Sequence, residues 1–249
     1  MRLGDKKIIV TGGGSGFGAA MCRRFAAEGA KVLVADLNGE AAARVAKEIG
    51  PSARPFTVDV SLGVQVHAMV EDALSAFGDL DAVVNNAGYT HRNMPMLEVD
   101  EATFDRVYAV NVKAIYWAAR AAVPVFRKRG GGAFLNIAST AGMRPRPGLT
   151  WYNGSKGAVI LLTKSMAVEL APEKIRVNAL CPVMGVTGML ESFMGLPDTP
   201  QNRAKFISTV PMGRLAEPDD VAKAAIYFVS EESDFITGVC MPVDGGRTV

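Results

Sequence analysis

The sequence predicts an α/β protein of one domain, residues 1–249, built on a doubly wound parallel sheet of about seven strands with helices on both faces. Short apolar runs rich in β-branched residues alternate with longer amphipathic segments along the whole chain. A cluster of glycines stands between the first such run and the first amphipathic segment. With 249 residues, of which 49% are hydrophobic, the chain can bury one large core.

The individual elements follow from this alternation. The expected strands are Lys7–Thr11, Lys31–Ala35, Arg54–Val58, Ala82–Asn85, Ala133–Ile137, Arg176–Cys181 and Val239–Val243. The expected helices are Gly16–Glu28, Ala41–Ile49, Val64–Phe77, Glu101–Arg129, Thr150–Leu170 and Pro218–Ser230. The stretch 183–211 is rich in Met, Gly and Pro, so we expect an irregular, mostly apolar lid over a substrate site. Strands joined by helices of this length form right-handed crossovers, which places helices on both faces of a parallel sheet.

Composition and charge exclude several classes of function. The 27 basic and 25 acidic residues nearly cancel, to a formal charge of +2, so no bulk field attracts nucleic acid. Three widely separated cysteines give neither a disulfide framework nor metal-ligand spacing, and no metal site is expected. The chain shows no signal peptide and no apolar run of about 18 residues, so a cytoplasmic protein without a membrane segment is expected.

The glycine cluster predicts a phosphate-binding loop. In an open α/β sheet, ligands bind at the carboxyl ends of the strands, and this loop directly follows the first strand. It reads T-G-x-x-x-G-x-G, and glycine allows both the tight turn and the close approach of backbone N–H groups to a pyrophosphate. We therefore expect a Rossmann-type dinucleotide site, with contacts from Gly12, Ser15, Gly16, Phe17 and Gly18.

The second strand ends in an acidic residue that predicts the cofactor. Asp36, followed by Leu37, lies about 20 residues beyond the loop, where a carboxylate binds the adenosine ribose hydroxyls. The same charge would repel a 2′-phosphate, and no basic residue stands nearby, so NAD is expected rather than NADP. The alternative is that Asp36 caps the next helix, although Asn38 could equally do so. The loops after the third and fourth strands add expected contacts from Asp59, Val60, Asn86, Ala87 and Gly88.

The stretch Tyr152-Asn153-Gly154-Ser155-Lys156 predicts acid–base chemistry. Four residues separate the phenol from the amine, so both lie on one face of a helix. An ammonium ~4–5 Å away would favour the phenolate by roughly 3 kcal/mol, or about two pK units, at an effective dielectric of about 20. Ser139, upstream, could hold a carbonyl or alkoxide oxygen beside the phenol. The alternative is a chance Tyr-x-x-x-Lys pair in which Lys156 lies beside a half-buried ring.

Taken together, these pieces resemble the short-chain dehydrogenase/reductase family across essentially the whole chain. The matching motifs are Thr11-Gly12 through Gly18, Asn85-Asn86-Ala87-Gly88, Asn111, Ser139, Tyr152 with Lys156, and Val243-Asp244-Gly245-Gly246. The resemblance implies a catalytic tetrad of Asn111, Ser139, Tyr152 and Lys156. In that family pattern Tyr152 exchanges a proton with the substrate oxygen, which Ser139 polarises. Lys156 lowers the pKa of the phenol and holds the nicotinamide ribose, and Asn111 anchors a water.

One departure concerns the loop after the sixth strand. The family usually has Pro-Gly there, whereas this chain has Pro182-Val183, with the glycine displaced to Gly185. Val183 adds bulk near the nicotinamide, and Thr187 still fits the position that meets the carboxamide or a phosphate. Expected cofactor contacts in this loop are Pro182, Val183, Gly185 and Thr187.

The predicted substrate contacts lie around the tetrad and are Ser139, Arg144, Trp151, Tyr152 and Met189. Arg144 or Arg146 could pair with a carboxylate, sulfonate or phosphate on the substrate, the alternative being that both are solvated. His91 follows the fourth-strand loop and is expected at the surface, the alternative being that it faces the mouth of the pocket.

Three functions are consistent with these residues. The leading one is an NAD-dependent alcohol dehydrogenase or ketone reductase acting on a polyol, cyclic alcohol or hydroxy acid. The second is a 3-oxoacyl-thioester reductase of fatty-acid synthesis using NADPH, against which Asp36 argues. The third is a non-catalytic dinucleotide sensor. The resemblance also implies a homotetramer, or a homodimer, formed through the helices at 101–129 and 150–170 and the closing strand.

Overall fold

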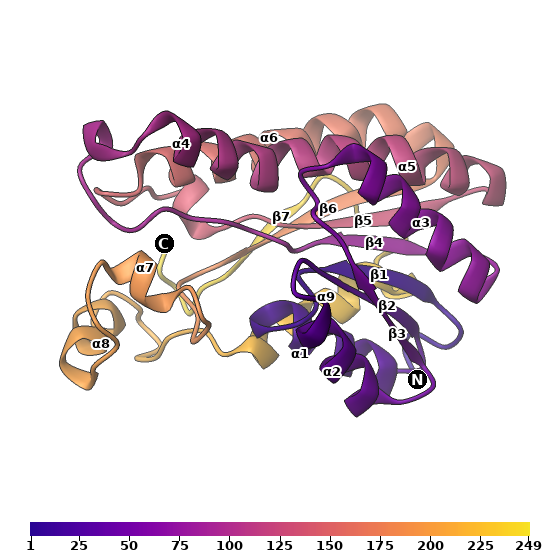
Figure 1. Cartoon of the computed structure of the whole chain (residues 1–249), viewed down its shortest axis with the longest axis horizontal. Helices are drawn as coiled ribbons and strands as arrows, with labels where there is room; N and C mark the ends of the chain where they lie inside the picture. The colour runs from indigo at the N-terminus through magenta and orange to yellow at the C-terminus, as the bar shows by residue number, and fades with distance from the viewer.

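Seven parallel strands form one sheet in the order β3-β2-β1-β4-β5-β6-β7 in the computed structural model, which describes residues 1–249 (Figure 1). The predicted fold class is confirmed, and every predicted strand is present within about two residues of its expected bounds. The strands are β1 (Lys7–Thr11), β2 (Lys31–Asp36), β3 (Ala53–Thr57), β4 (Ala82–Asn85), β5 (Gly132–Ile137), β6 (Ile175–Pro182) and β7 (Cys240–Val243).

Helices cover both faces of the sheet (Figure 1). On one face lie α1 (Gly16–Ala27), α2 (Gly39–Ile49) and α9 (Pro218–Val229), and on the other α3 (Gly63–Phe77), α5 (Ala114–Arg129) and α6 (Thr150–Leu170). Alternate residues of β1 point to opposite faces of the sheet. Ile8 and Val10 pack in the core cluster beneath α1 and α9, and Ile9 packs in the cluster beneath α3 and α5. Because both faces are covered, the central strands are continuously apolar.

The strand order reverses between β1 and β4, so the connections that follow these two neighbouring strands leave in opposite directions. This is the topological switch point of the sheet. Thr11 ties the two loops together there: its hydroxyl donates to the Val84 carbonyl (3.2 Å) and accepts from the backbone N–H groups of Asn86 (3.0 Å) and Ala87 (3.1 Å). The candidate site lies at this end of the sheet.

The predicted helix 101–129 is interrupted, which corrects the expectation of one continuous helix. Residues 101–108 form α4, Ala109–Lys113 form a π-helical turn, and α5 begins at Ala114. Asn111 lies in this turn and is buried, with its side-chain amide bonded to Tyr89 and Ser155. These tertiary bonds favour the widened turn, and π-bulges of this kind are frequent at functional sites.

The stretch 183–211 is not irregular throughout, a second correction. It contains two short helices, α7 (Leu190–Met194) and α8 (Pro200–Ile207), which lie beyond the carboxyl ends of the strands (Figure 1). Pro200 occupies the first turn of α8, and the Thr199 hydroxyl accepts from the backbone N–H of Asn202, so local start signals were present.

No helix of the fold has the length and apolarity needed to cross a bilayer.

Candidate active site

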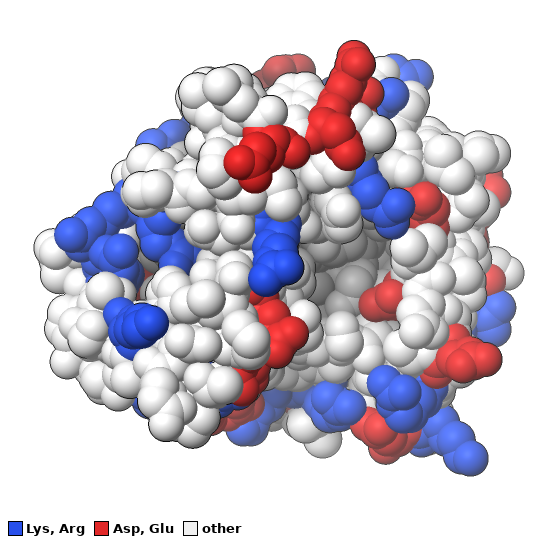
Figure 2. All heavy atoms as spheres, turned by 60° about the vertical axis from the view of Figure 1, so that its left-hand side comes forward, with Lys and Arg blue, Asp and Glu red and all other residues white.

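A cavity of about 770 Å³ opens at the carboxyl ends of the strands, a volume typical of small-molecule sites. Figure 2 shows the hollowed face, with basic and acidic side chains around the opening. The cavity extends from Asp36 beside β2 to Met189 and Phe206 under the lid helices. The predicted cofactor residues that line it are Gly12, Ser15, Gly16, Phe17, Asp36, Leu37, Asp59, Val60, Asn86, Ala87, Gly88, Tyr152, Lys156, Pro182, Val183, Gly185 and Thr187.

The glycines that follow β1 are needed for two different reasons, backbone conformation and close packing. Gly12 and Gly16 have φ values of +63° and +51°, in the left-handed region where a side chain is strained. Gly18, also predicted to contact the cofactor, does not line the cavity. A Cβ at Gly18 would lie 2.0 Å from the Gly12 carbonyl oxygen. Gly18 therefore allows α1 to pack directly beneath the loop.

The Asp36 carboxylate joins the first two loops at the edge of the cavity. Its Oδ2 accepts from the backbone N–H of Gly14 and its Oδ1 from that of Asn38, both at 2.9 Å. The side chain that caps α2 is Asn38, whose Oδ1 accepts from the backbone N–H of Ala41 at 3.0 Å. The structure thus assigns the helix cap to Asn38 and leaves Asp36 facing the cavity.

The displaced glycine after β6 has a packing reason. A Cβ at Gly185 would lie 2.3 Å from the Phe17 ring, so this glycine makes room for an aromatic side chain in the first turn of α1. Val183 is buried against Val210 while still lining the cavity. The side chain of Thr187 lies beside the glycine loop, 3.2 Å from where a Cβ on Gly16 would be.

Tyr152, Lys156 and Ser139 meet in the middle of the cavity. Tyr152 lies in the first turn of α6, and the Lys156 Nζ, one turn on, lies 5.8 Å from the phenol ring centroid. The ammonium donates to the Ile137 carbonyl of β5 at 2.8 Å. Ser139 follows β5 directly, so the end of one strand and the start of one helix bring the three side chains together.

The pKa of Tyr152 is a further correction. Burial raises it to about 12, although the hydrogen bond with Ser139 and the charge of Arg146 act to lower it. Burial lowers the pKa of Lys156 to about 8. The phenol pKa is therefore raised rather than lowered as expected: burial dominates, and the Lys156 amine, which donates to the Ile137 carbonyl, is not among the groups that shift it.

Asn111 lies behind the main cavity rather than on its wall. Its Oδ1 accepts from the Tyr89 N–H at 2.8 Å, and its Nδ2 donates to the Tyr89 carbonyl (2.9 Å) and to the Ser155 hydroxyl (3.0 Å). Together with Lys156 and Asn85 it lines a separate cavity of about 10 Å³. That space is close to what one water molecule needs, as the predicted water-anchoring role requires.

The comparisons with known proteins identify the family. A family model described as "Enoyl-(Acyl carrier protein) reductase" matches residues 12–248. The chain is a short-chain dehydrogenase/reductase. It is 52% identical, over 100% of both chains, to 4-formylbenzenesulfonate dehydrogenase of Comamonas testosteroni. It is 36% identical to cyclopentanol dehydrogenase of Comamonas sp., with 99% of this chain and 98% of that protein covered.

A solved structure supports the same assignment. The crystal structure of 3-ketoacyl-(acyl-carrier-protein) reductase from Brucella melitensis complexed with NADH has a TM-score of 0.95 and 46% identity. The match covers 99% of this chain and 100% of that one.

On the substrate side of this short-chain dehydrogenase/reductase, Ser139, Arg144, Tyr152 and Met189 line the cavity as predicted. Trp151 does not: its indole N–H donates to the Met96 carbonyl at 3.1 Å. Its position next to Tyr152 in the chain turns it to a different face of α6.

His91 is buried rather than at the surface, with its Nδ1 2.8 Å from the Arg92 carbonyl, and it does not line the cavity. The expectation for His91 was therefore wrong, because the loop after β4 folds under other segments.

Sequence reasoning missed the contribution of the last residues. Arg247 and Thr248 line the cavity, and the Arg144 guanidinium donates to the Arg247 carbonyl at 2.7 Å. The only signal was their position directly after the Asp244-Gly245-Gly246 motif. From the lid, the Phe193 ring packs edge-on against Tyr152, with centroids 5.1 Å apart.

Proposed function

We propose that this protein is an NAD(H)-dependent oxidoreductase that transfers a hydride between the nicotinamide and a secondary alcohol or ketone. The observation that supports it is one continuous cavity with a carboxylate, Asp36, at one end and a buried phenol–hydroxyl pair, Tyr152 with Ser139, in its middle. The relatives named as alcohol dehydrogenases, and the neighbour complexed with NADH, agree with this reaction.

The residues along the cavity fit a dinucleotide. The positive φ values of Gly12 and Gly16 favour residues without side chains, which would leave the backbone N–H groups of the loop open to the phosphates. Asp36 would accept hydrogen bonds from the ribose hydroxyls. Asp59 and Val60 would flank the adenine, and Asn86 through Gly88, with residues 182–187, the nicotinamide half. When bound, NAD accepts or supplies the hydride.

The residues of this chain then supply position and a proton. Tyr152 and Ser139 hold the substrate oxygen, and Tyr152 donates the proton in reduction or accepts it in oxidation. Because burial raises the pKa of Tyr152 to about 12, the phenol is protonated at neutral pH and is ready for reduction. Lys156 holds the nicotinamide ribose, Asn111 a relay water, and the segment 183–211 acts as a lid that excludes water.

A 3-oxoacyl-thioester reductase is the second candidate. The neighbour from Brucella melitensis and a protein of Thermotoga maritima that is 35% identical over 100% of both chains carry that name. Since the former is complexed with NADH, a preference for NADH would not exclude this activity. Acetoacetyl-CoA with NADH and with NADPH is therefore tested beside the alcohols.

The deciding experiment is a panel of secondary alcohols and hydroxy acids with NAD, monitored as reduced cofactor at alkaline pH. Turnover of an alcohol with kcat/KM well above that for acetoacetyl-CoA reduction supports the dehydrogenase. The opposite ratio supports the reductase. Tight NAD binding without turnover of either class would instead indicate the third hypothesis, a dinucleotide sensor.

We also propose a cytoplasmic homotetramer. Apolar side chains remain exposed on the helices expected to pair, among them Tyr116 (50%) on α5 and Leu161 (66%) and Val168 (81%) on α6. All three cysteines are free, as is usual in a reducing compartment. Light scattering at micromolar concentration tests the assembly, and a monomeric mass would contradict it.

A further inference from the structure

The cavity wall carries charges of both signs. Asp36 ends β2 and Asp59 follows β3, whereas α4 contributes Asp105 together with Arg106. Beneath the lid, on the far side of Tyr152, the wall instead carries Arg144, Arg146 and Arg247. The lining residues within 137–146, 182–215 and 247–248 include these three arginines and no acidic side chain, so this part of the wall is cationic.

Arg146 has no counter-ion. It is half-buried, forms no ion pair, and its guanidinium donates no hydrogen bond within the chain. It lies against the Phe206 ring of α8, with Cζ 5.4 Å from the ring centroid. Burial and the neighbouring charge of Arg247 lower its pKa, and no carboxylate counteracts them. A partly desolvated cation beside a second cation is unfavourable unless an anion occupies the space between them.

The position of Arg146 is fixed by the catalytic helix. Its carbonyl accepts from the Asn153 side chain at 2.8 Å, and Asn153 directly follows Tyr152. The Arg146 charge is also close enough to lower the pKa of the Tyr152 phenol. Arg146 therefore lies on the substrate side of the acid–base residue.

Arg247 lines the same space and also forms no ion pair. The nearest acidic side chain in sequence, Asp244, is already bound: it accepts from the backbone N–H groups of Gly246 (3.0 Å) and Thr248 (2.8 Å) and from the Thr248 hydroxyl (2.6 Å). Arg144 is exposed and uses its guanidinium on the Arg247 carbonyl, so it positions the last turn. Of the two arginines singled out in the sequence, the structure thus favours Arg146.

Between Tyr152 and these cations the wall is apolar and includes two aromatic rings. Phe193 packs edge-on to Tyr152, and the Arg146 guanidinium lies over the Phe206 ring. Met184, Met189 and Leu215 complete this wall. A flat apolar body fits such a wall better than a flexible polar chain does.

We propose that Arg146 and Arg247 bind an oxyanion substituent of the substrate, a carboxylate or sulfonate, at the end of a flat apolar body whose alcohol or carbonyl carbon faces Tyr152. This assignment rests on the proposed oxidoreductase function and names its substrate class. Charge-assisted bonds from two guanidinium groups would supply most of the discrimination against neutral analogues.

The test uses a matched pair of alcohols, 4-(1-hydroxyethyl)benzoate and 1-phenylethanol, with NAD. For the unaltered protein we expect the anionic alcohol to have the higher kcat/KM. In Arg146→Gln the KM of the anionic alcohol should rise about 10- to 100-fold, as for loss of a charge-assisted bond, while kcat falls by no more than a few-fold. Arg146→Lys, which keeps the charge, should restore part of the affinity.

The control variant is Arg203→Gln. Arg203 lies on the lid helix α8 and pairs with Asp198, outside the cavity wall, and the change removes the same charge. It should leave the preference for the anionic alcohol unchanged. Equal effects of the Arg146 and Arg203 variants, or equal kcat/KM for both alcohols in the unaltered protein, would overturn the proposal.

Failure of the proposed function gives a different pattern. If neither alcohol is turned over, titration calorimetry of 4-(1-hydroxyethyl)benzoate into the NAD-loaded protein still reports on the anion site. Binding that is lost in Arg146→Gln but kept in Arg203→Gln supports the site while the reaction is revised. Absence of binding in the unaltered protein overturns the site.

Discussion

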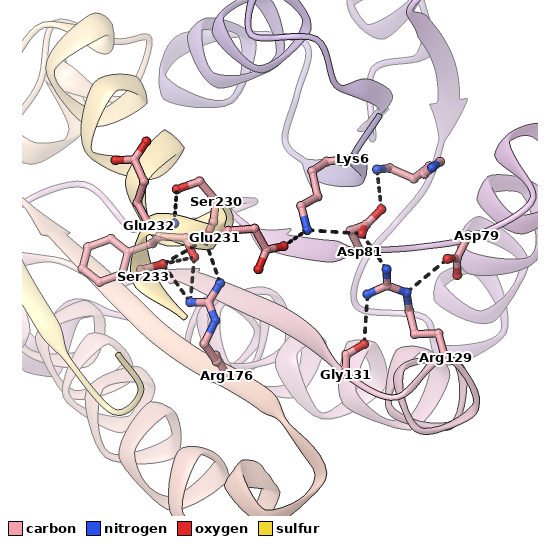
Figure 3. Close-up of polar contacts among 12 residues, drawn as sticks. Lys6, Asp79, Asp81, Arg129, Gly131, Arg176, Ser230, Glu231, Glu232 and Ser233 are labelled. Carbon is pink, nitrogen blue, oxygen red and sulfur yellow. Dashed lines mark hydrogen bonds and ion pairs between the residues drawn. The ribbon is translucent and has the colours of Figure 1, made fainter. Parts of the chain in front are cut away.

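Arginines at the two ends of the sheet differ in whether their side chains have partners within the chain. At the amino end, Arg129 donates to Asp79 (3.1 Å), Asp81 (2.7 Å) and the Gly131 carbonyl (3.1 Å) (Figure 3). Lys6 bridges Asp81 and Glu231 in the same network.

Nearby, the Arg176 guanidinium donates to the carbonyls of Phe228 and Ser230 and to the Ser233 hydroxyl, which joins β6 to the end of α9 (Figure 3). Together these contacts connect the starts of β1, β4, β5 and β6. At the carboxyl end, Arg146 and Arg247 have no such partners. A charge satisfied inside the chain stabilises the fold, whereas an unsatisfied one on a cavity wall is available to a ligand.

The largest expected effect tests the carboxyl end. Tyr152→Phe removes the proton carrier while leaving the ring against Phe193, so kcat should fall about 10³-fold, within the range for a general acid–base group. NAD affinity, measured by fluorescence titration, should stay within a few-fold of its original value. Retained turnover with NAD still bound would require a different acid.

The next prediction concerns the ion pairs of Asp81 at the amino end of the sheet. Asp81 is buried and paired with Arg129 and Lys6, so Asp81→Ala removes the acidic partner that the two cations share and leaves each with one exposed or half-exposed carboxylate. The free energy of unfolding in urea should fall by about 2–3 kcal/mol, less than for a fully buried pair because Arg129 is 29% exposed.

As control, Asp72→Ala breaks the pair with Arg54, which is 52% exposed, and should cost below about 1 kcal/mol. The KM values for the two alcohols should not change in either variant. A loss of substrate preference in Asp81→Ala would remove the distinction between the two ends.

A third prediction concerns the acidic end of the cavity. Asp36→Ala removes the acceptor for ribose hydroxyls and the charge that repels a 2′-phosphate. The ratio of kcat/KM with NADP to that with NAD should rise about 10- to 100-fold, as for a charge-assisted bond. Asp59→Asn is the matched control, because the adenine is common to both cofactors; an equal change of the ratio there would contradict the role of Asp36.

The smallest expected effect is that of the Arg146 charge on the pH dependence of alcohol oxidation. Alcohol oxidation needs the Tyr152 phenolate, and burial raises the pKa of this phenol to about 12, so kcat/KM for oxidation should increase with pH between 7 and 9. Arg146 acts to lower that pKa, so Arg146→Gln should move the profile toward alkaline pH and reduce oxidation of 1-phenylethanol a few-fold at fixed pH. An unmoved pH profile would show that the Arg146 charge does not reach the phenol.

Much of the fold could be predicted because its signals are local. Short continuous runs of β-branched residues such as Ile8–Val10 indicate buried strands. The loop between β1 and α1 needs glycine at Gly12 and Gly16 because both have positive φ. The rule that ligands bind at strand carboxyl ends then placed Asp36, Ser139 and Tyr152 on one edge of the sheet.

The sequence by itself determined the order of elements, the glycine loop and the spacing of Tyr152 and Lys156, since each depends on neighbours along the chain. Only the tertiary structure decided the π-helical turn at Asn111, the burial that shifts the Tyr152 pKa upward, and which arginine lies beside the phenol. Desolvation and pairing depend on segments distant in the chain, as when the Arg144 side chain binds the carbonyl of Arg247. No local pattern specifies such contacts, because they exist only after the elements have packed.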